Sequence, residues 1–229
     1  MMSETAYDWS KVAYDFLTSS LIDDIEEELY AQKLIAYQFS ARGHTLSQVL
    51  LGTLLDNPHD AISAYYRSRP LLITAGLTPA DAFSGPLGKA GGYSDGRDIG
   101  VVCNLVSTGG ATVLPMAGDV GSQYTPGIGW AESIRYFYSV LADKSYKDAI
   151  SVVHGGEGSM ASNGYWSALN IATTEKLPVL FFIEDNHYAM SVPRNTQTPG
   201  GNFADNISSF KNLKIIQVDG TDPGDASSA

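Results

Sequence analysis

The second half of the chain alternates between helix-like stretches and short apolar runs, and this alternation constrains the fold more than any other feature. It predicts helices at 130–143 and 163–175 and strands at 149–154, 178–184 and 213–218. The strand-like runs are apolar throughout, as expected when helices cover both faces of a parallel sheet. We therefore predict an α/β fold with a three-layer, mostly parallel, doubly wound sheet. Ligands bind to such sheets beyond the carboxyl ends of the strands.

The first half predicts helices and loops. Apolar residues recur at helical spacing between Ala6 and Phe39, which predicts an amphipathic helix. Its acidic residues, at 23, 24 and 26–28, are expected to form a solvated face without a function. This helix belongs to an N-terminal helical segment at 1–44, and the α/β domain follows at 45–229.

Two shorter helices are predicted at 45–55 and 79–87. The second has the Thr78 hydroxyl as its N-cap and Pro79 at its first position. Between 85 and 129 glycine is frequent and periodicity is poor, which predicts long loops over the scaffold.

The composition excludes several classes of protein. With 229 residues, of which 44% are hydrophobic and 17% charged, the chain can bury a substantial core. Its net charge of -11 argues against binding to nucleic acid or to an anionic membrane surface. Residues 1–20 lack the pattern of a secretory signal, and no run of about 18 apolar residues occurs. A single cysteine, Cys103, excludes an internal disulfide framework, so we expect a soluble, cytoplasmic protein.

A Gly-Glu-Gly turn follows the strand at 149–154, and an Asp-Asn pair follows the strand at 178–184. Glycines at 155, 156 and 158 allow a sharp turn that brings backbone N–H groups close to an anion. Glu157 would repel a bare diphosphate at this turn, but it would serve as an oxygen ligand if a divalent cation lay between them. Asn186 follows the neighbouring strand and is expected at the same edge of the sheet. Together these residues predict a metal-diphosphate site.

Each of these residues also has an ordinary interpretation when it is taken alone. Glu157 is a favourable charge at a helix N-terminus, and Asn186 is a common turn residue. Three further residues also have ordinary interpretations: Tyr188 as a packing aromatic, Arg67 as a surface ion-pair residue, and Cys103 as a small hydrophobic residue. Three of the histidines are expected to be structural, namely His44, His59 and His154.

The Gly-Glu-Gly turn and the Asp-Asn pair together resemble the thiamin-diphosphate motif, in which Gly-Asp-Gly is followed by Asn about 30 residues later. Residues 43–220 look like the alpha-type chain of the thiamin-diphosphate-dependent component of 2-oxo acid dehydrogenase complexes. The matching stretches lie in the family's order at 65–83, 119–129, 156–193, 197–201 and 218–223. The resemblance implies oxidative decarboxylation of a 2-oxo acid and acyl transfer to a lipoyl group. It also implies Mg2+ and thiamin diphosphate as cofactors.

The resemblance assigns roles residue by residue. The metal would be held by Glu157, Asn186 and the backbone carbonyl of Tyr188. Glu157 stands where most members of the family have Asp, and in this it is similar to members of the branched-chain 2-oxo acid branch. The whole set implied for cofactor binding comprises Tyr66, Arg67, Gly118, Val120, Gly156, Glu157, Gly158, Ser159, Asn186 and Tyr188. Within it, the backbone at 118 and 120 would meet the aminopyrimidine ring, and the others would meet the diphosphate or the metal.

The chain departs from the family pattern in three places. The family's downstream histidine loop is absent, and its aminopyrimidine-activating glutamate belongs to a beta-type half. The family segment Gly-Arg-Gln-Met-Pro-x-His appears at 96–102 without its histidine. No catalytic residue is therefore assigned, although His187 lies next to the metal position. We expect a half-site that is inactive alone, in a chain truncated at its C-terminus or dependent on partners.

The implied partners are a beta-type subunit or domain and a lipoyl-bearing acyltransferase, in a hetero-oligomer that acts on a 2-oxo acid. The sequence leaves open whether that acid is pyruvate, a branched-chain acid or another. Two alternatives also stay open: a transketolase-like thiamin enzyme, and a non-catalytic scaffold in a multienzyme complex. A generic nucleotide-binding Rossmann protein is poorly supported, because no GxGxxG stands between the first strand and helix.

Overall fold

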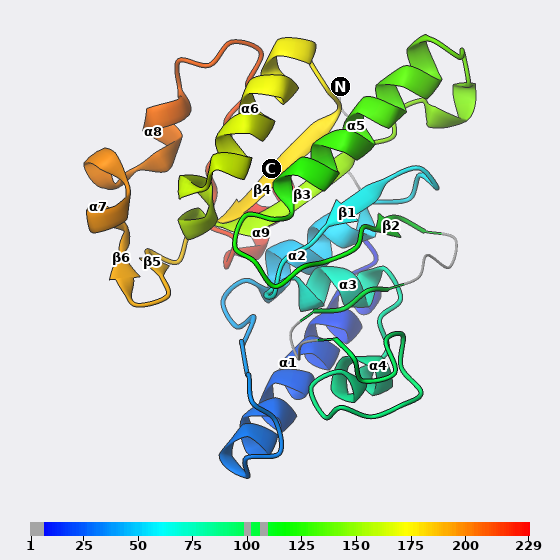
Figure 1. Ribbon diagram of the computed structural model, residues 1–229, viewed down its shortest axis with the longest axis vertical. Helices are drawn as coiled ribbons and strands as arrows, with labels where there is room; N and C mark the ends of the chain where they lie inside the picture. Colours follow the sequence, from blue (N-terminus) through cyan, green and yellow to red (C-terminus); the bar gives the residue numbers. More distant parts are fainter. Residues whose placement is uncertain (1–6, 99–101, 106–109) are drawn as a thin grey trace. The chain divides into compact units, whose positions relative to one another are not determined.

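The structure is a computed structural model that describes residues 7–98, 102–105 and 110–229 (Figure 1). The chain divides into two compact units. The first unit comprises Met1–Asp56, Tyr66–Leu105 and Val218–Ala229, and the second comprises Asn57–Tyr65 and Val106–Gln217. The predicted boundary between residues 44 and 45 stays a prediction.

The second unit contains a parallel sheet of four strands. In spatial order these are β2 (Thr112–Val113), β1 (Ala61–Ser63), β3 (Ser151–Gly156) and β4 (Val179–Glu184). The longest ladder pairs β3 with β4 over six residues, from Ser151 opposite Val179 to Gly156 opposite Glu184. The sheet confirms the predicted α/β class, and β3 and β4 confirm two of the predicted strands.

Two helices, α5 (Tyr124–Ser139) and α6 (Asn163–Glu175), lie side by side against this sheet (Figure 1). The prediction for α6 is confirmed at both ends. The Ser162 hydroxyl accepts a hydrogen bond from the Tyr165 N–H at its start, and Lys176 takes the left-handed conformation at its end. The core between helices and sheet includes Tyr124, Ile128, Ala131, Val153, Met160, Tyr165, Ala168 and Leu169.

Helix α5 begins at Tyr124 rather than at the predicted position 130. Its first turns contain Pro126, Gly127 and Gly129, which the sequence pattern treats as loop residues. Packing explains Gly127, because a Cβ at this position would lie 2.3 Å from Cγ2 of Val153. Close contact with β3 therefore outweighs the low helix propensity of glycine.

The first unit is mostly helical. Its helices are α1 (Trp9–Ala31), α2 (Thr45–Thr53), α3 (Arg69–Thr74), α4 (Pro79–Ser84) and α9 (Pro223–Ser228). Helices α1, α2 and α3 contact one another, and α9 contacts α2. The predicted cap of α4 is confirmed, because the Thr78 hydroxyl accepts a hydrogen bond from the Asp81 N–H.

The prediction of a solvated acidic face on α1 is wrong for part of the acidic run. Asp23 and Glu26 are 0% and 1% exposed, whereas Leu17 and Leu21 are 58% and 59% exposed. Helical periodicity places Asp23 and Glu26 on one stripe of α1, and that stripe faces Arg69 from α3. A positive partner distant in sequence thus buries two acids of a run that the sequence pattern places in solvent.

The predicted strand at 213–218 is also wrong: the structure gives this described segment no strand assignment. Ile215, Ile216 and Val218 are 37%, 51% and 48% exposed. An apolar run forms a strand only where a neighbouring strand shares its backbone hydrogen bonds, and this segment has no ladder partner among the described residues.

The region after β4 forms several short elements instead. They are the antiparallel pair β5 (Tyr188–Ala189) and β6 (Val192–Pro193), then α7 (Arg194–Gln197), η3 (Pro199–Gly201) and α8 (Phe203–Ile207). Earlier in the chain, η1 (Lys144–Tyr146) follows α5, and η2 (Glu157–Ala161) follows β3. No helix within the described ranges is long and apolar enough to span a membrane.

Candidate metal and diphosphate site

The carboxyl ends of β3 and β4 place the two halves of the predicted motif next to each other. Gly156 is paired with Glu184 in the parallel ladder. Glu157 therefore leaves the sheet beside Asp185 and Asn186, although 29 residues separate Glu157 from Asn186. This edge of the sheet is the usual ligand position in parallel α/β folds.

Glu157 is buried at the start of η2, with only 4% of the residue exposed. Its Oε1 atom is buried and has no hydrogen-bond partner among the residues that the structure describes. Burial raises the pKa of this carboxyl group, and the nearby Asp185 carboxylate raises it further. The backbone N–H groups of Glu157, Asn186 and Gly158 act in the opposite direction and favour the charged form. A buried carboxylate oxygen without a partner fits a bound cation, which would compensate both burial and repulsion.

Asn186 and Tyr188 lie in an exposed turn directly after β4. The Asn186 side-chain oxygen accepts a hydrogen bond from the Tyr188 N–H at 3.0 Å. An amide oxygen has two lone pairs, so this contact orients the side chain and leaves one acceptor position for a ligand. His187, between them, has a positive φ of 71°, which turns the backbone sharply at this point.

An ion pair closes the loop that carries Asn186. The Arg194 guanidinium lies 2.7 Å from the Asp185 carboxylate, and the Arg194 N–H donates to the His187 carbonyl at 2.9 Å. The other oxygen of Asp185 accepts from the His187 N–H at 2.8 Å. Sequence reasoning marked Asp185 only as the first residue of the Asp-Asn pair, and it assigned no role to Arg194, which lies between the matching stretches at 156–193 and 197–201.

The glycine turn fits closely against this loop. A Cβ on Gly158 would lie 2.6 Å from the Cβ of Ala189, so only glycine allows β5 to approach the turn. The Gly158 carbonyl accepts a hydrogen bond from the Gln197 side chain at 3.1 Å. Gln197 opens the Gln-Thr-Pro-Gly-Gly stretch, and its contact was not predicted from the sequence.

The Ser159 hydroxyl is already used within the fold. It donates to the Gly156 carbonyl at 2.6 Å and forms a second hydrogen bond, also of 2.6 Å, with the Tyr124 hydroxyl. A bound anion would therefore meet the backbone N–H of Ser159 rather than its side chain.

Gly118 and Val120 lie in the exposed loop between β2 and α5. Gly121, the next glycine, has a φ of +89° and approaches the start of α6, where a Cβ would lie 2.4 Å from the Ser162 hydroxyl. This contact holds the loop next to the end of η2, within the same compact unit. Tyr66 and Arg67 belong instead to the first unit.

A buried polar network lies beneath the carboxyl ends of the strands. His154 of β3 places Nε2 3.3 Å from Oε1 of Glu184, and the Tyr65 hydroxyl donates to Oε2 of Glu184 at 2.8 Å. All three residues are less than 9% exposed. The network ties β3 and β4 to Tyr65, two residues after the end of β1, which agrees with the expectation that His154 is structural.

The other candidate residues do not form a reactive or metal-binding site of this kind in the described part of the chain. Burial raises the pKa of Cys103 to about 11, so its thiol stays protonated near neutral pH. Within the described ranges, no group of three or more His, Cys, Asp or Glu side chains is arranged to hold a metal. A cation at Glu157 would therefore need amide and backbone oxygens as its further ligands. Of the segment 96–102 that lacks the family histidine, residues Ile99, Gly100 and Val101 lie outside the described residues.

The parallel sheet and the acid-bearing glycine turn at its carboxyl edge define an α/β protein with a candidate ligand site at the strand ends. The comparison with known families makes this more specific: the model of the Dehydrogenase E1 component family matches residues 16–229. The chain belongs to this family.

Relatives of this chain include alpha subunits of two dehydrogenases. The chain is 27% identical to 2-oxoisovalerate dehydrogenase subunit alpha 2, mitochondrial, from Arabidopsis thaliana, over 93% of this chain and 42% of the relative. It is 28% identical to the 2-oxoisovalerate dehydrogenase subunit alpha of Bacillus subtilis, over 82% and 54%. It is also 28% identical to the pyruvate dehydrogenase E1 component subunit alpha of Staphylococcus epidermidis, over 88% and 49%. The chain thus spans about half the length of the curated relatives it matches.

Proposed function

We propose that this chain is the alpha-type part of a 2-oxo acid dehydrogenase and that it binds Mg2+ and thiamin diphosphate at the carboxyl edge of β3 and β4. Its reaction is the oxidative decarboxylation of a 2-oxo acid with acyl transfer to a lipoyl group. Family membership and the names of the relatives support this reaction class.

The observation that carries the proposal is the buried Oε1 atom of Glu157. A carboxylate oxygen without a partner is costly inside a protein, and such groups persist where a ligand or metal satisfies them. Asn186 lies at the adjacent strand end and offers an amide oxygen. Hard cations such as Mg2+ prefer oxygen ligands of this kind.

Glu157, the Asn186 side chain and the Tyr188 carbonyl would hold the metal. Gly158 and Ser159 lie in the first turn of η2, and their backbone N–H groups would donate to diphosphate oxygens. The ion pair between Arg194 and Asp185 keeps the loop after β4 closed, so the amide and carbonyl oxygens stay at the sheet edge.

Thiamin diphosphate, when bound, supplies the electron sink that allows carbon dioxide to leave. The protein contributes binding and orientation. Arg67 would bind the diphosphate together with Tyr66, because its planar guanidinium suits phosphate oxygens. Backbone groups at Gly118 and Val120 would orient the aminopyrimidine ring.

The beta-type subunit or domain would supply the rest of the active site, and a lipoyl-bearing acyltransferase would receive the acyl group. We place this hetero-oligomer in the cytoplasm, in agreement with the single cysteine. The relatives suggest pyruvate and 2-oxoisovalerate as the two substrates to compare first.

The test is equilibrium binding of thiamin diphosphate with Mg2+ to the assembled protein, by calorimetry. Glu157→Ala and Asn186→Ala are each expected to weaken binding by roughly 100-fold or more, because they remove proposed metal ligands. Asp148→Asn is the control, since this acid is exposed and lies in the same unit. Unchanged affinity in both site variants would overturn the assignment.

A further inference from the structure

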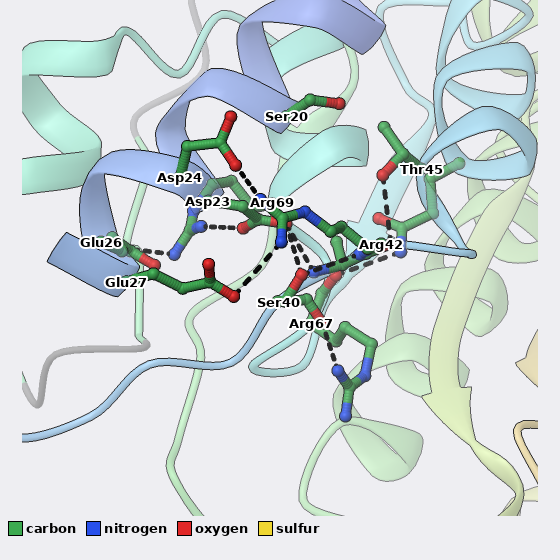
Figure 2. Close-up of polar contacts among 12 residues, drawn as sticks. Ser20, Asp23, Asp24, Glu26, Glu27, Ser40, Arg42, Thr45, Arg67 and Arg69 are labelled. Carbon is green, nitrogen blue, oxygen red and sulfur yellow. Dashed lines mark hydrogen bonds and ion pairs between the residues drawn. The ribbon is translucent and has the colours of Figure 1, made fainter. Parts of the chain in front are cut away.

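Three arginines of the first unit meet the acids of α1 and the loop that follows it (Figure 2). Arg69 divides its guanidinium between two acids, 2.9 Å from Asp23 and 2.7 Å from Glu26. All three side chains are at most 10% exposed. Two buried carboxylates therefore neutralise this arginine completely, and it has no charge left for a ligand.

Asp23 uses its second oxygen to hold the loop after α1. Oδ2 accepts from the Ser40 hydroxyl at 2.8 Å and from the Ala41 N–H at 3.0 Å. With Arg69 on Oδ1, the carboxylate receives three hydrogen bonds, which offset the cost of its burial. Asp23, which lies in α1 and precedes Ser40 by 17 residues, thereby fixes the position of Ser40.

Ser40 in turn holds Arg67. The Ser40 carbonyl accepts a hydrogen bond from Nη1 of Arg67, as Figure 2 shows. The Arg67 backbone carbonyl accepts from the Gln48 side chain at 3.1 Å, and its guanidinium lies 5.4 Å from the centre of the Tyr66 ring. Main chain and side chain of Arg67 are thus both oriented.

The partners of Arg67 are neutral, unlike those of the other two arginines. Arg42 pairs with the exposed acids Asp24 and Glu27, and Arg69 pairs with buried acids. Within the part of the chain that the structure describes, Arg67 makes no ion pair. A carbonyl oxygen orients a guanidinium without cancelling its charge, so Arg67 is held in place while its charge stays available for an anion.

We propose that Asp23 is a positioning residue for Arg67: it anchors Ser40, whose carbonyl orients the Arg67 guanidinium while its charge stays available for an anion. This inference rests on the proposed function, because Arg67 is the proposed contact to the diphosphate. It gives a positioning role to Asp23, a buried acid that the sequence pattern places on a solvated face.

The test is a double-mutant cycle on dissociation constants for thiamin diphosphate with Mg2+, measured in the assembled protein. Arg67→Gln and Asp23→Asn are each expected to weaken binding by about tenfold or more. The double variant is expected to bind no more weakly than Arg67→Gln alone, because both changes remove the same contact. A purely structural role for Asp23 would instead give additive losses.

Ser40→Ala is the milder variant, because it removes the hydroxyl anchor, keeps the carbonyl and leaves the buried ion pairs intact. It is expected to weaken binding severalfold and to lose this effect in the Arg67→Gln background. If Asp23→Asn does not fold, Ser40→Ala decides the question alone. Glu27→Gln, at an exposed acid of the same helix, is the control and is expected to bind normally.

The outcomes separate the two proposals. Full affinity in Ser40→Ala and Asp23→Asn, with weakened binding in Arg67→Gln, overturns only the positioning role. Full affinity in Arg67→Gln overturns the positioning role, and the proposed function then stands or falls on Glu157→Ala. Additive losses across the cycle also overturn the positioning role.

Discussion

Gly156 and Glu184 face each other across the parallel ladder of β3 and β4, and this pairing brings the two halves of the proposed metal site together. Glu157 follows the end of β3 and Asn186 follows the end of β4, so the register of the sheet brings the two residues close together. A slip of the register would separate them, so the site depends on the buried strands beneath it.

Glu157→Gln is expected to stabilise the protein in the absence of metal while it weakens cofactor binding. The buried carboxylate has an oxygen without a partner in the described ranges and a neighbouring carboxylate, and a neutral amide avoids the cost of burying the charge. Thermal unfolding without Mg2+ at pH 8 should show a rise in Tm of roughly 2–4 °C.

The pH dependence of this gain has a definite sign. Because the pKa of Glu157 is raised in the folded protein, its unfavourable contribution grows as the pH rises through the folded pKa. The advantage of Glu157→Gln should therefore be largest at neutral pH and should disappear toward pH 4.5, the ordinary value. An equal or lower Tm for the variant at pH 8 would refute the account of this carboxylate.

Glu26 makes a similar prediction in the first unit. Burial raises its pKa, although Arg69 opposes the shift. The stability associated with its protonated form is fully present below the ordinary pKa of 4.5 and is lost as the pH rises through the folded pKa. Denaturant unfolding between pH 4.5 and 8 should show a smaller loss of stability with rising pH in Glu26→Gln than in the wild type. Parallel curves would contradict this.

Tyr65→Phe is expected to destabilise the second unit by roughly 1–3 kcal/mol, because it removes the hydroxyl that donates to the buried Glu184 carboxylate. Chemical denaturation measures this loss. Tyr136→Phe is the matched control, since Tyr136 is 51% exposed and should change stability little. Equal effects of the two substitutions would show that the buried network contributes nothing.

Gly158→Ala is expected to displace β5 from the glycine turn, since the new Cβ would lie 2.6 Å from the Cβ of Ala189. We expect a loss of roughly 1–3 kcal/mol in stability. Gly129→Ala in α5 meets nothing within 4 Å and should stabilise the helix by about 0.5–1 kcal/mol. Unfolding of the two variants under the same conditions tests the pair, and a neutral Gly158→Ala would be incompatible with the observed packing.

Local signals predicted some elements well. Helix α6 has its cap at Ser162 and a left-handed Lys176 at its end, so periodicity and capping agree. The proximity of Glu157 and Asn186 could be predicted from the sequence, because parallel strands end at one edge of the sheet. The start of α5 could not be predicted from the sequence, because the helical conformation of Gly127 depends on its packing against Val153.

Other features depend on partners far away in the sequence. The burial of Asp23 and Glu26 requires Arg69, which lies 46 and 43 residues further along the chain. The ion pair of Arg194 with Asp185 forms only after β5 and β6 turn the chain back on itself. The apolar run at 213–218 has the composition of a strand, but it has no pairing neighbour in the described part of the chain, and composition alone does not reveal that.

The central claim is that Glu157 and its neighbours hold a divalent cation that binds a diphosphate. The most direct measurement is calorimetric titration of the assembled protein with thiamin diphosphate, with Mg2+ present and again after chelation with EDTA. The account predicts saturable binding that depends on Mg2+ and is lost in Glu157→Ala. Binding of equal strength without the cation, or no binding in its presence, would contradict it.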